Sequence, residues 1–429
     1  QHRLNSEYVN AACKSAINMT IAVIGAGAAG MMATATLQAL TPTSRIILLE
    51  KNALMGRKVQ ISGGGRCNVT TGLHDIKTVL TRYQRGRKFL STAMYHFPPD
   101  QVYDWFEQHG VPLKIEADGR VFPQSDIGKD VVDLFERMFQ PPTVQLRLRT
   151  SVTAITKTDR FHITLQSVET IMVDKLILTT GGQAYRHTGS TGEGYQFAET
   201  LGHHITPLAA SLNSFIVSNQ WIKQLAGVSF VAVGLYVQGH KDYRFSGSIV
   251  CTHQGISGPA VFALSSQVAF EDYNAHHPLP VLIDFIPTMS NEQLRHELNT
   301  AINQNPKQQL RTTLHVWLPK SVVNALVAEL RLPAEKTNAE VSNLMRQRVL
   351  DQLKRCPLAV IGRAAGDEFV TAGGIELSEV NPRTMESKLC PGLYFAGEIL
   401  NIDGYTGGYN LQAAWATGHL AGSSVSAVL

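Results

Sequence analysis

Residues 20–50 carry the pattern of a dinucleotide-binding β-α-β unit. An apolar run, Thr20–Ile24, is followed by the turn GAGAAG, by small residues as far as about Leu40, and by a second apolar run that ends at Glu50. In such a turn the first glycine allows a tight bend, the second lets backbone approach a pyrophosphate, and the third lets the helix pack against the strand. We therefore predict an α/β fold in which nucleotide phosphates meet the N-terminus of the first helix.

Glu50 narrows the choice of nucleotide. It lies about 20 residues beyond the glycines, where an acidic side chain binds both hydroxyls of an adenosine ribose, and its charge would repel a 2′-phosphate. A glycine-rich turn alone is weak evidence because it can be merely structural. Strand, helix, second strand and acid together predict FAD or NAD.

The composition excludes several classes of protein. A net charge of +4 with 17% charged residues is too small to indicate a nucleic-acid or membrane partner, so the basic run at 82–88 is interpreted as a solvated face. The five cysteines lack a C-x-x-C pair, which predicts no metal site, no disulfide framework and a cytoplasmic location. No run reaches the roughly 18 apolar residues of a membrane helix. Residues 1–18 are expected to be an upstream extension or a cloning remnant.

The rest of the chain changes character several times. Residues 146–180 resemble a β-meander whose last run is KLILTT, residues 205–286 are rich in short β-like runs, and residues 288–355 show helical spacing of apolar residues. The end of the chain is a short strand, the pair Gly397-Glu398, and the glycines Gly407-Gly408 before a helix that begins near Tyr409.

This C-terminal segment favours FAD over NAD. An acid after a strand can bind a ribityl hydroxyl, and a helix N-terminus at the pyrimidine edge of a flavin stabilises the negative charge of the reduced ring. An NAD-binding unit needs no such returning segment. The alternative interpretation is an ordinary turn before a surface helix.

Six motifs resemble those of the YhiN/BaiN-like FAD-dependent flavoproteins, which include the aminoacetone oxidase group. They are GAGAAG, SGGGRCN, GRVFPQS, TTGGQAYRHTGSTGEGY, THQGISGPA and PGLYFAGEILNIDGYTGGYNLQAAWATG. The resemblance implies a glutathione-reductase-type Rossmann FAD-binding domain (19–204 plus 357–429), an inserted β-rich domain (205–287) and a further inserted helical domain (288–356).

The resemblance also implies which residues bind FAD. The glycine-rich turn would hold the pyrophosphate, Glu50 the ribose and Val152 the adenine, while the SGGGRCN loop and the C-terminal segment would line the ribityl chain and the flavin. The predicted cofactor-binding residues are Gly25, Gly27, Ala28, Ala29, Gly30, Glu50, Lys51, Arg57, Lys58, Ser62, Gly64, Arg66, Cys67, Asn68, Val152, Gly181, Gly397, Glu398, Gly408, Tyr409, Asn410 and Leu411.

Residues for catalysis are harder to choose. His253, in the loop THQGISGP, is the candidate for proton transfer, although a loop histidine bonded to backbone is the competing interpretation. Cys67 has no resolving partner, so a packing role beside the ring is favoured over a redox thiol. The pairs His203-His204 and His276-His277 are interpreted as surface or turn residues.

The leading functional expectation, by resemblance, is an FAD-dependent oxidoreductase that oxidises a small amine such as aminoacetone and passes electrons to O2, giving hydrogen peroxide. The alternative is a reductase that uses NAD(P)H to reduce an activated C=C bond of a bile-acid-like enone. A remote alternative is an RNA-associated flavoprotein. The sequence leaves the substrate and the oligomeric state open.

Overall fold

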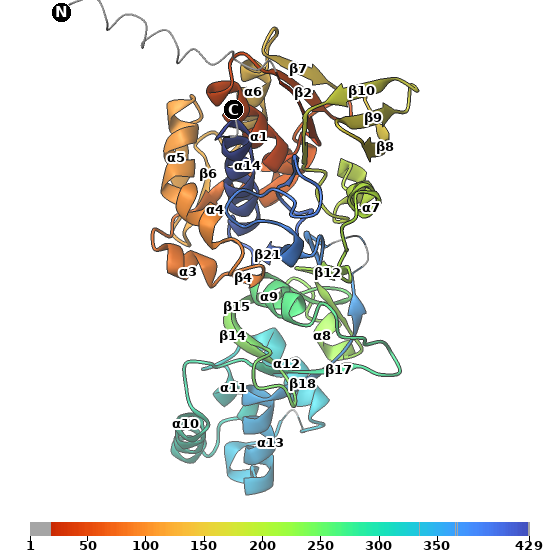
Figure 1. Ribbon diagram of the computed structural model, residues 1–429. Helices are drawn as coiled ribbons and strands as arrows, with labels where there is room; N and C mark the ends of the chain where they lie inside the picture. Colours follow the sequence, from red (N-terminus) through yellow and green to blue (C-terminus); the bar gives the residue numbers. More distant parts are fainter. Residues whose placement is uncertain (1–18, 334, 365, 367, 428–429) are drawn as a thin grey trace, which may run out of the picture. The chain divides into compact units, whose positions relative to one another are not determined.

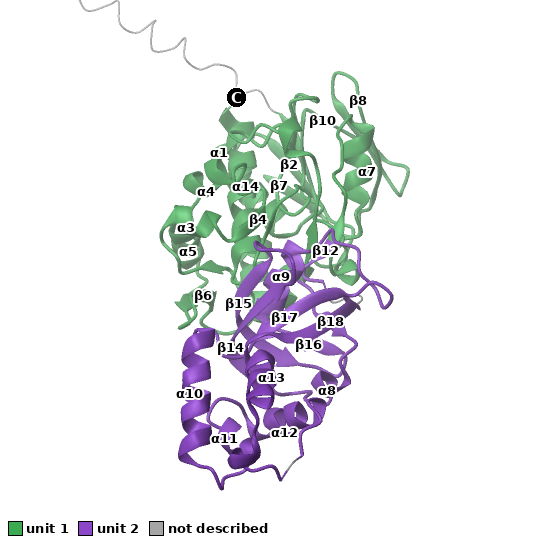
Figure 2. Ribbon diagram, turned by 90° about the horizontal axis from the view of Figure 1, so that it is seen from below, with its two compact units in different colours: residues 1–209, 370–429 green, residues 210–369 purple. Residues whose placement is uncertain are grey.

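The computed structural model describes residues 19–333, 335–364, 366 and 368–427, so the predicted extension at 1–18 lies outside the described residues. The chain divides into two compact units (Figure 2). Unit 1 comprises residues up to 209 together with 370 onward, and unit 2 comprises residues 210–369. Segments from both ends of the chain therefore share one unit.

The centre of unit 1 is a five-stranded parallel sheet. Its strand order is β20 (Leu393–Phe395), β11 (Lys175–Leu178), β1 (Thr20–Ile24), β2 (Arg45–Leu49) and β7 (Val144–Arg147). Strands β1, β2, β11 and β20 are almost entirely buried, as expected when helices and loops cover both faces of a parallel sheet, whereas only Val144 is buried in the edge strand β7. Because the strands are parallel, the turns that follow β1, β2, β11 and β20 all lie at the same edge.

The predicted meander is correct for three of its four runs. β8 (Val152–Lys157), β9 (Phe161–Leu165) and β10 (Thr170–Val173) form an antiparallel sheet. The fourth run, KLILTT, is instead β11 of the parallel sheet. Its apolar composition fits either place, and only its pairing with β1 and β20 decides between them.

Helices α1 (Ala28–Leu40) and α14 (Tyr409–Ala427) lie side by side in unit 1 (Figure 1). They approach closely because the contact consists of small residues. A Cβ atom on Gly418 would lie 2.4 Å from the Ala29 carbonyl oxygen, and one on Gly422 would lie 2.8 Å from the Ala33 carbonyl oxygen. The C-terminal helix thus packs directly on the helix of the glycine-rich turn.

Shorter elements complete unit 1. They are α2 (Arg57–Ile61), η1 (Ser62–Gly65), β3 (Thr70–Thr71), α3 (Ile76–Leu80), β4 (Tyr83–Arg85), α4 (Ser91–His96), α5 (Pro99–Gln108), β5 (Leu113–Ile115), β6 (Arg120–Pro123), α6 (Lys129–Met138), η2 (Arg186–Thr188), α7 (Glu193–Thr200), β19 (Val370–Ala372), η4 (Leu377–Glu379) and β21 (Asp403–Gly404).

Unit 2 contains a closed antiparallel barrel and a group of helices. The barrel order is β13 (Phe215–Val217), β16 (Gly255–Ser257), β15 (Arg244–Cys251), β14 (Ser229–Val237), β17 (Leu279–Asp284) and β18 (Cys356–Arg363). The helices are α8 (Gln220–Lys223), α9 (Pro259–Gln267), α10 (Asn291–Gln304), α11 (Leu310–Leu314), α12 (Lys320–Glu329), η3 (Asn338–Glu340) and α13 (Asn343–Lys354). The remaining strand, β12 (Ala209–Ser211), spans the division between the units.

The barrel and the helices of unit 2 share one hydrophobic core. A buried ion pair also joins them, because Lys354 Nζ at the end of α13 lies 2.6 Å from Asp284 Oδ2 at the end of β17. The division between the units falls at 369/370, whereas the sequence placed the return to the FAD domain at 357, inside barrel strand β18. The finer three-part division stays a prediction. Within the described part of the chain, none of the helices combines the length and apolar character needed to cross a bilayer.

The close contact between α1 and α14 predicts that a glycine-to-alanine substitution there lowers stability, the opposite of its usual effect in a helix. Replacing glycine by alanine inside a helix stabilises it by about 1 kcal/mol when the site is open. At Gly418 the new methyl group would collide with backbone that cannot turn aside, so we expect Gly418→Ala to destabilise the protein by about 1–3 kcal/mol. Thermal unfolding measures this change. Ser423→Ala, at a half-buried site on the same helix, is the control, and a raised melting temperature for Gly418→Ala would contradict the packing.

His419 on α14 predicts acid sensitivity. Its ring stacks on Phe97 at 4.2 Å between centroids, and its Nδ1 atom is buried without a partner among the described residues. Burial, and secondarily His96, lowers the pKa of His419 to about 4. In the unfolded chain the His419 imidazole binds a proton near pH 6.5, whereas in the folded chain it stays neutral until about pH 4. The free energy of unfolding therefore falls as the pH drops from 6.5 toward 4.

We expect His419→Phe to remove about 1–2 kcal/mol of that acid-induced loss, because the stacked ring stays and the titrating group goes. Urea unfolding of both proteins at pH 7 and pH 5 measures the difference. His276→Gln, at an exposed position, is the control. An equal loss in wild type and His419→Phe would show that His419 does not carry the effect.

Candidate functional site

The turn after β1 has the geometry of a phosphate-binding turn. Gly25 has a φ of 103°, and a Cβ atom there would lie 2.6 Å from the Thr179 carbonyl oxygen. A Cβ atom on Gly30 would lie 1.9 Å from the Gly25 carbonyl oxygen. By contrast, a Cβ atom on Gly27, the N-cap of α1, would meet nothing within 4 Å. The N-terminus of α1 therefore faces open space, which suits an anionic group.

Glu50 lies beside this turn at the end of β2. Its buried carboxylate accepts hydrogen bonds from Ala26 N (2.9 Å), Asn52 N (2.8 Å) and Asn52 Nδ2 (2.7 Å). These bonds fix the carboxylate against the glycine-rich turn. Asn52 was not among the residues predicted from the sequence, although an asparagine two residues after the acid is a detectable signal for such a bond.

The SGGGRCN loop presents bare backbone. Gly64 and Gly65 have φ values of 73° and 89°, and a Cβ atom on either would meet nothing within 4 Å. Arg66, one of the predicted cofactor-binding residues, is engaged with its neighbours. Its guanidinium lies 3.8 Å from the centroid of the Phe122 ring and pairs with Glu116 at 2.7 Å. Arg66 thus holds the loop against the β5–β6 hairpin.

Three further residues of this region pack or bond internally. Ser62 Oγ donates to the Val59 carbonyl oxygen at 2.8 Å, and Asn68 Oδ1 accepts from Val121 N at 3.3 Å. Cys67 is fully buried with a φ of 60°, and burial raises the pKa of its thiol to about 12. The thiol is therefore protonated at neutral pH, which favours the packing role over a redox thiolate.

The C-terminal segment meets these N-terminal loops directly. A Cβ atom on Gly397 would lie 2.8 Å from the Ala29 Cβ, and one on Gly408 would lie 2.1 Å from the Thr70 carbonyl oxygen. Lys58 Nζ lies 2.6 Å from Glu398 Oε2. Predicted residues from both ends of the chain are therefore in contact.

Several predicted side chains in the C-terminal segment bond to other parts of the protein. Glu398 Oε1 accepts from Thr371 N at 2.9 Å. The Asn410 side-chain amide closes the loop before α14, donating to Gly404 O at 2.8 Å and accepting from Gly404 N at 2.9 Å. Tyr409 and Leu411 begin α14, with Tyr409 buried. This loop is thereby held rigid around the N-terminus of the helix.

Strand β4 supports the same loop and was missed at the level of sequence. It pairs with β21, and Tyr83 OH donates to the Tyr409 carbonyl oxygen at 2.7 Å. The Arg85 guanidinium forms an ion pair with the fully buried carboxylate of Asp403. No sequence pattern indicates this pair, since its members are 318 positions apart and Arg85 lies within a basic run.

The remaining predicted residues are placed as follows. Arg57 is exposed on α2, and Val152 is half-buried at the start of β8. Lys51 Nζ donates to Thr191 Oγ1 at 2.8 Å, and Gly181 has a φ of 74° just after β11. His253 is exposed in the β15–β16 turn of unit 2, and its catalytic role stays a prediction.

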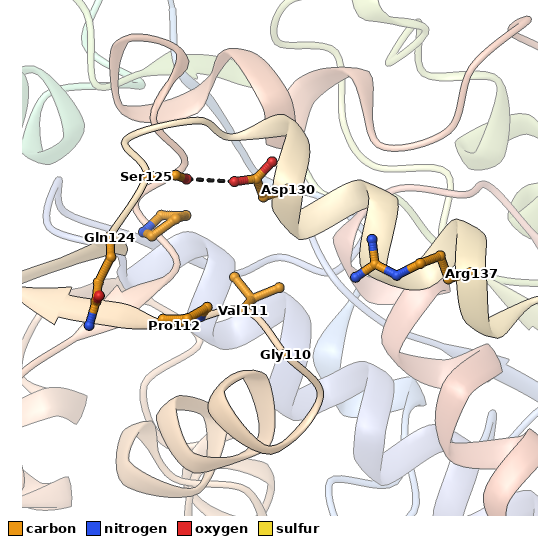
Figure 3. Close-up of a pocket in the computed structure, with 8 residues that line it drawn as sticks. Gly110, Val111, Pro112, Gln124, Ser125, Asp130 and Arg137 are labelled. Atoms are coloured by element: carbon orange, nitrogen blue, oxygen red, sulfur yellow. Dashed lines mark hydrogen bonds between the residues drawn. The ribbon is translucent and has the colours of Figure 1, made fainter.

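A surface cavity of about 230 Å³ lies elsewhere in unit 1 (Figure 3). Figure 3 shows two of its lining residues, Ser125 and Asp130, joined by a hydrogen bond, which is 2.6 Å long. Its lining comprises Gly110, Val111, Pro112, Pro123, Gln124, Ser125, Asp130 and Arg137, and includes none of the residues predicted to bind the cofactor. We do not assign it to the nucleotide.

The residues at the carboxyl edge of the sheet fit a dinucleotide. Open glycine backbone faces space at both Gly27 and Gly64, and a helix N-terminus is free of a side-chain cap. Two buried hydroxyls beside this edge, Thr180 Oγ1 and Tyr195 OH, have no hydrogen-bond partner within the described ranges. Such unsatisfied groups are suited to a polar ligand.

The Arg85–Asp403 pair yields a stability prediction. Removing one member of a buried ion pair leaves an uncompensated charge and costs about 3–5 kcal/mol. We expect Arg85→Met to destabilise the protein by this amount, and Arg85→Met combined with Asp403→Leu to recover part of it. Urea unfolding of the single and double variants measures both. A double variant less stable than Arg85→Met alone would contradict this account.

Comparisons with known proteins identify the family of this chain. A family model described as the HI0933-like protein Rossmann domain matches residues 19–424. The chain is 31% identical to the ribosomal RNA dihydrouridine synthase of Escherichia coli (strain K12) over 404 residues, covering 92% of this chain and 95% of the relative. It is 29% identical to the 3-dehydro-bile acid delta(4,6)-reductase of Clostridium scindens over 411 residues, covering 95% and 98%.

A second ribosomal RNA dihydrouridine synthase, from Haemophilus influenzae, is 28% identical over 416 residues, covering 94% of this chain and 98% of the relative. Among solved structures, Escherichia coli quinol fumarate reductase FrdA is 16% identical with a TM-score of 0.48, covering 95% of this chain and 70% of that chain. The family model covers nearly all of the described residues. The chain therefore belongs to the HI0933-like family, the YhiN/BaiN group of FAD-dependent Rossmann oxidoreductases.

Proposed function

We propose that this protein reduces a carbon–carbon double bond conjugated to a carbonyl group, using FAD. The observation that carries the proposal is that the relatives which match more than nine-tenths of the chain are named for two reactions of this kind. One name denotes reduction of the delta(4,6) double bonds of a 3-dehydro-bile acid, and the other the conversion of uridine to dihydrouridine in ribosomal RNA.

The two reactions share one electronic requirement. In both substrates the double bond is polarised by a carbonyl, so the carbon distant from the carbonyl accepts a hydride and the carbon next to it accepts a proton. Bound FAD, when reduced by two electrons from a donor of the NAD(P)H class, supplies that hydride. The protein must then orient the flat substrate, exclude water and provide the proton.

The described residues suit the placement of a planar ring and of a reduced flavin. The open backbone of Gly64 and Gly65 lets a planar ring approach without side-chain interference. The N-terminus of α14, held by Asn410 and Tyr83, would direct its positive end at the pyrimidine edge of the flavin. For the proton, His253 remains the candidate. The sequence first suggested oxidation of a small amine, but the three relatives reported above are not named for such a reaction. Amine oxidation is therefore kept as the alternative to double-bond reduction.

Uridine in ribosomal RNA is the first substrate to test. Two of the relatives carry that activity in their names, and the basic stretch after β4 contains Arg87 and Lys88, which are exposed and form no ion pair within the described residues. Local charge of this kind can bind phosphate even when the net charge of the chain is mild. A bile-acid-like dienone is the second candidate.

An anaerobic oxidation assay distinguishes the candidates. The holoprotein is bleached with NAD(P)H, and the return of flavin absorbance is followed after adding unmodified ribosomal RNA, a 3-oxo-4,6-diene steroid, or buffer. We expect rapid reoxidation by one of the two acceptors, with a gain of two hydrogens per product confirmed by mass spectrometry. If neither acceptor reoxidised the flavin and the protein formed peroxide from aminoacetone in air, the proposed reductase activity would be wrong and amine oxidation would take its place.

A further inference from the structure

Residues 183–192, here called the strap, lead from β11 into α7 across the carboxyl edge of the sheet in unit 1. Glycines with a left-handed backbone conformation lie just before the strap and within it, with φ values of 74° at Gly181, 105° at Gly189 and 89° at Gly192. Glycine adopts this conformation without steric cost, whereas other residues are strained there. The strap can therefore change its path at these points more easily than a chain of ordinary residues.

The first anchor of the strap lies on the flavin side of the predicted site. Thr371 Oγ1 accepts hydrogen bonds from Gln183 N at 2.7 Å and Ala184 N at 3.1 Å. The backbone N–H of the same Thr371 donates to Glu398, which pairs with Lys58. The start of the strap is thus linked, through Thr371, to Glu398, which is expected to meet the ribityl chain.

The second anchor lies on the adenosine side. Asn52 Nδ2 donates both to the Glu50 carboxylate at 2.7 Å and to the Thr188 carbonyl oxygen at 3.0 Å. Lys51 Nζ donates to Thr191 Oγ1 at 2.8 Å and pairs with Glu193 at 2.9 Å. The end of the strap is therefore tied to the residue predicted to bind the ribose and to its immediate neighbour.

Between the anchors, the Tyr185 ring lies edge-on to the His187 ring, and its centroid is 5.8 Å from Lys58 Nζ. Arg186 and His187 are exposed, and Arg186 bonds only within the strap, to Gln183 Oε1 at 2.8 Å, as far as the described residues show. Thr180 Oγ1 and Tyr195 OH, the buried hydroxyls without partners, flank its two ends in the sequence. A segment that joins both ends of a dinucleotide site, with unsatisfied hydroxyls beside it, is placed to cover the middle of the ligand.

We propose that the strap closes over bound FAD and that Lys51 and Asn52 form its latch, so that these two residues control how fast FAD leaves. Lys51 was expected to contact the cofactor. Its two partners on the strap and α7 instead make it a positioning residue. The inference rests on the FAD requirement of the family and not on which substrate is reduced.

The test measures FAD release from the holoprotein after dilution, by the rise in flavin fluorescence. Loss of a charge-assisted hydrogen bond weakens a contact by a factor of about ten, so we expect Lys51→Met to accelerate release about tenfold. Thr191→Val should act in the same direction with a smaller effect. Lys51→Arg keeps the pair with Glu193 and should release FAD at close to the wild-type rate.

Lys77→Met is the matched control, because Lys77 is exposed on α3 and forms no ion pair within the described residues. Release from this variant should be unchanged. Unchanged release from Lys51→Met would overturn the latch. If the wild-type protein did not bind FAD, the strap proposal would fail together with the assignment of the cofactor. If it bound FAD but reduced neither substrate, only the proposed function would fail, and the release measurements would still test the latch.

Trypsin gives a second readout that a simple loss of stability would not produce. Cleavage after the exposed Arg186 requires the strap to leave its place. We expect FAD to slow this cleavage in wild type and to protect less in Lys51→Met, as followed by mass spectrometry of the 186/187 cut. Equal cleavage rates with and without FAD in wild type would show that the strap does not cover the cofactor.

Discussion

The close packing of α1 against α14 is the contact on which the rest of unit 1 depends. It joins segments from the two ends of the chain through small residues, with Gly418 facing the Ala29 carbonyl. Because α1 begins at the glycine-rich turn and α14 begins at the Gly407-Gly408 loop, their contact sets the distance between the phosphate end and the ring end of the predicted site. The parallel sheet reinforces this arrangement by placing β1 and β20 in the same register through β11.

Local patterns in the sequence predicted the parts of the site that depend on backbone conformation. Gly25, Gly27 and Gly30 have the geometry expected of their motif, and the contact of Gly408 with the loop that follows Asn68 agrees with the expectation that the two ends meet. These residues are predictable because a single strand-to-helix turn imposes its own steric demands. The role of each predicted residue in binding FAD stays a prediction.

Partner choice between distant side chains could not be predicted. Lys58 and Glu398 were each expected to contact the flavin region, yet they pair with one another across 340 positions. His203 was expected to be a surface or turn residue; it follows a turn, but it is buried between the Glu379 carboxylate (3.1 Å) and the Ser387 hydroxyl (2.8 Å). Adjacent His204 is exposed. The sequence of a histidine pair does not indicate which ring is buried, because the residues that bond to the buried ring, here Glu379 and Ser387, are distant in the sequence.

The relatives of this chain are named for very different substrates, and one fold could serve both if separate residues bind the cofactor and select the substrate. The residues predicted to bind FAD at the carboxyl edge of the sheet offer mainly backbone N–H groups, glycines and a helix end, which would recognise phosphate and a planar ring without preferring a steroid or a nucleobase. Substrate choice must therefore come from side chains outside this set. If the substrate is RNA, as proposed, Arg87 and Lys88 beside β4 would be such side chains, since they are exposed and form no ion pair with any residue that the structure describes. They offer charge that a polyanion would use and a bile acid, with a single carboxylate, would use far less.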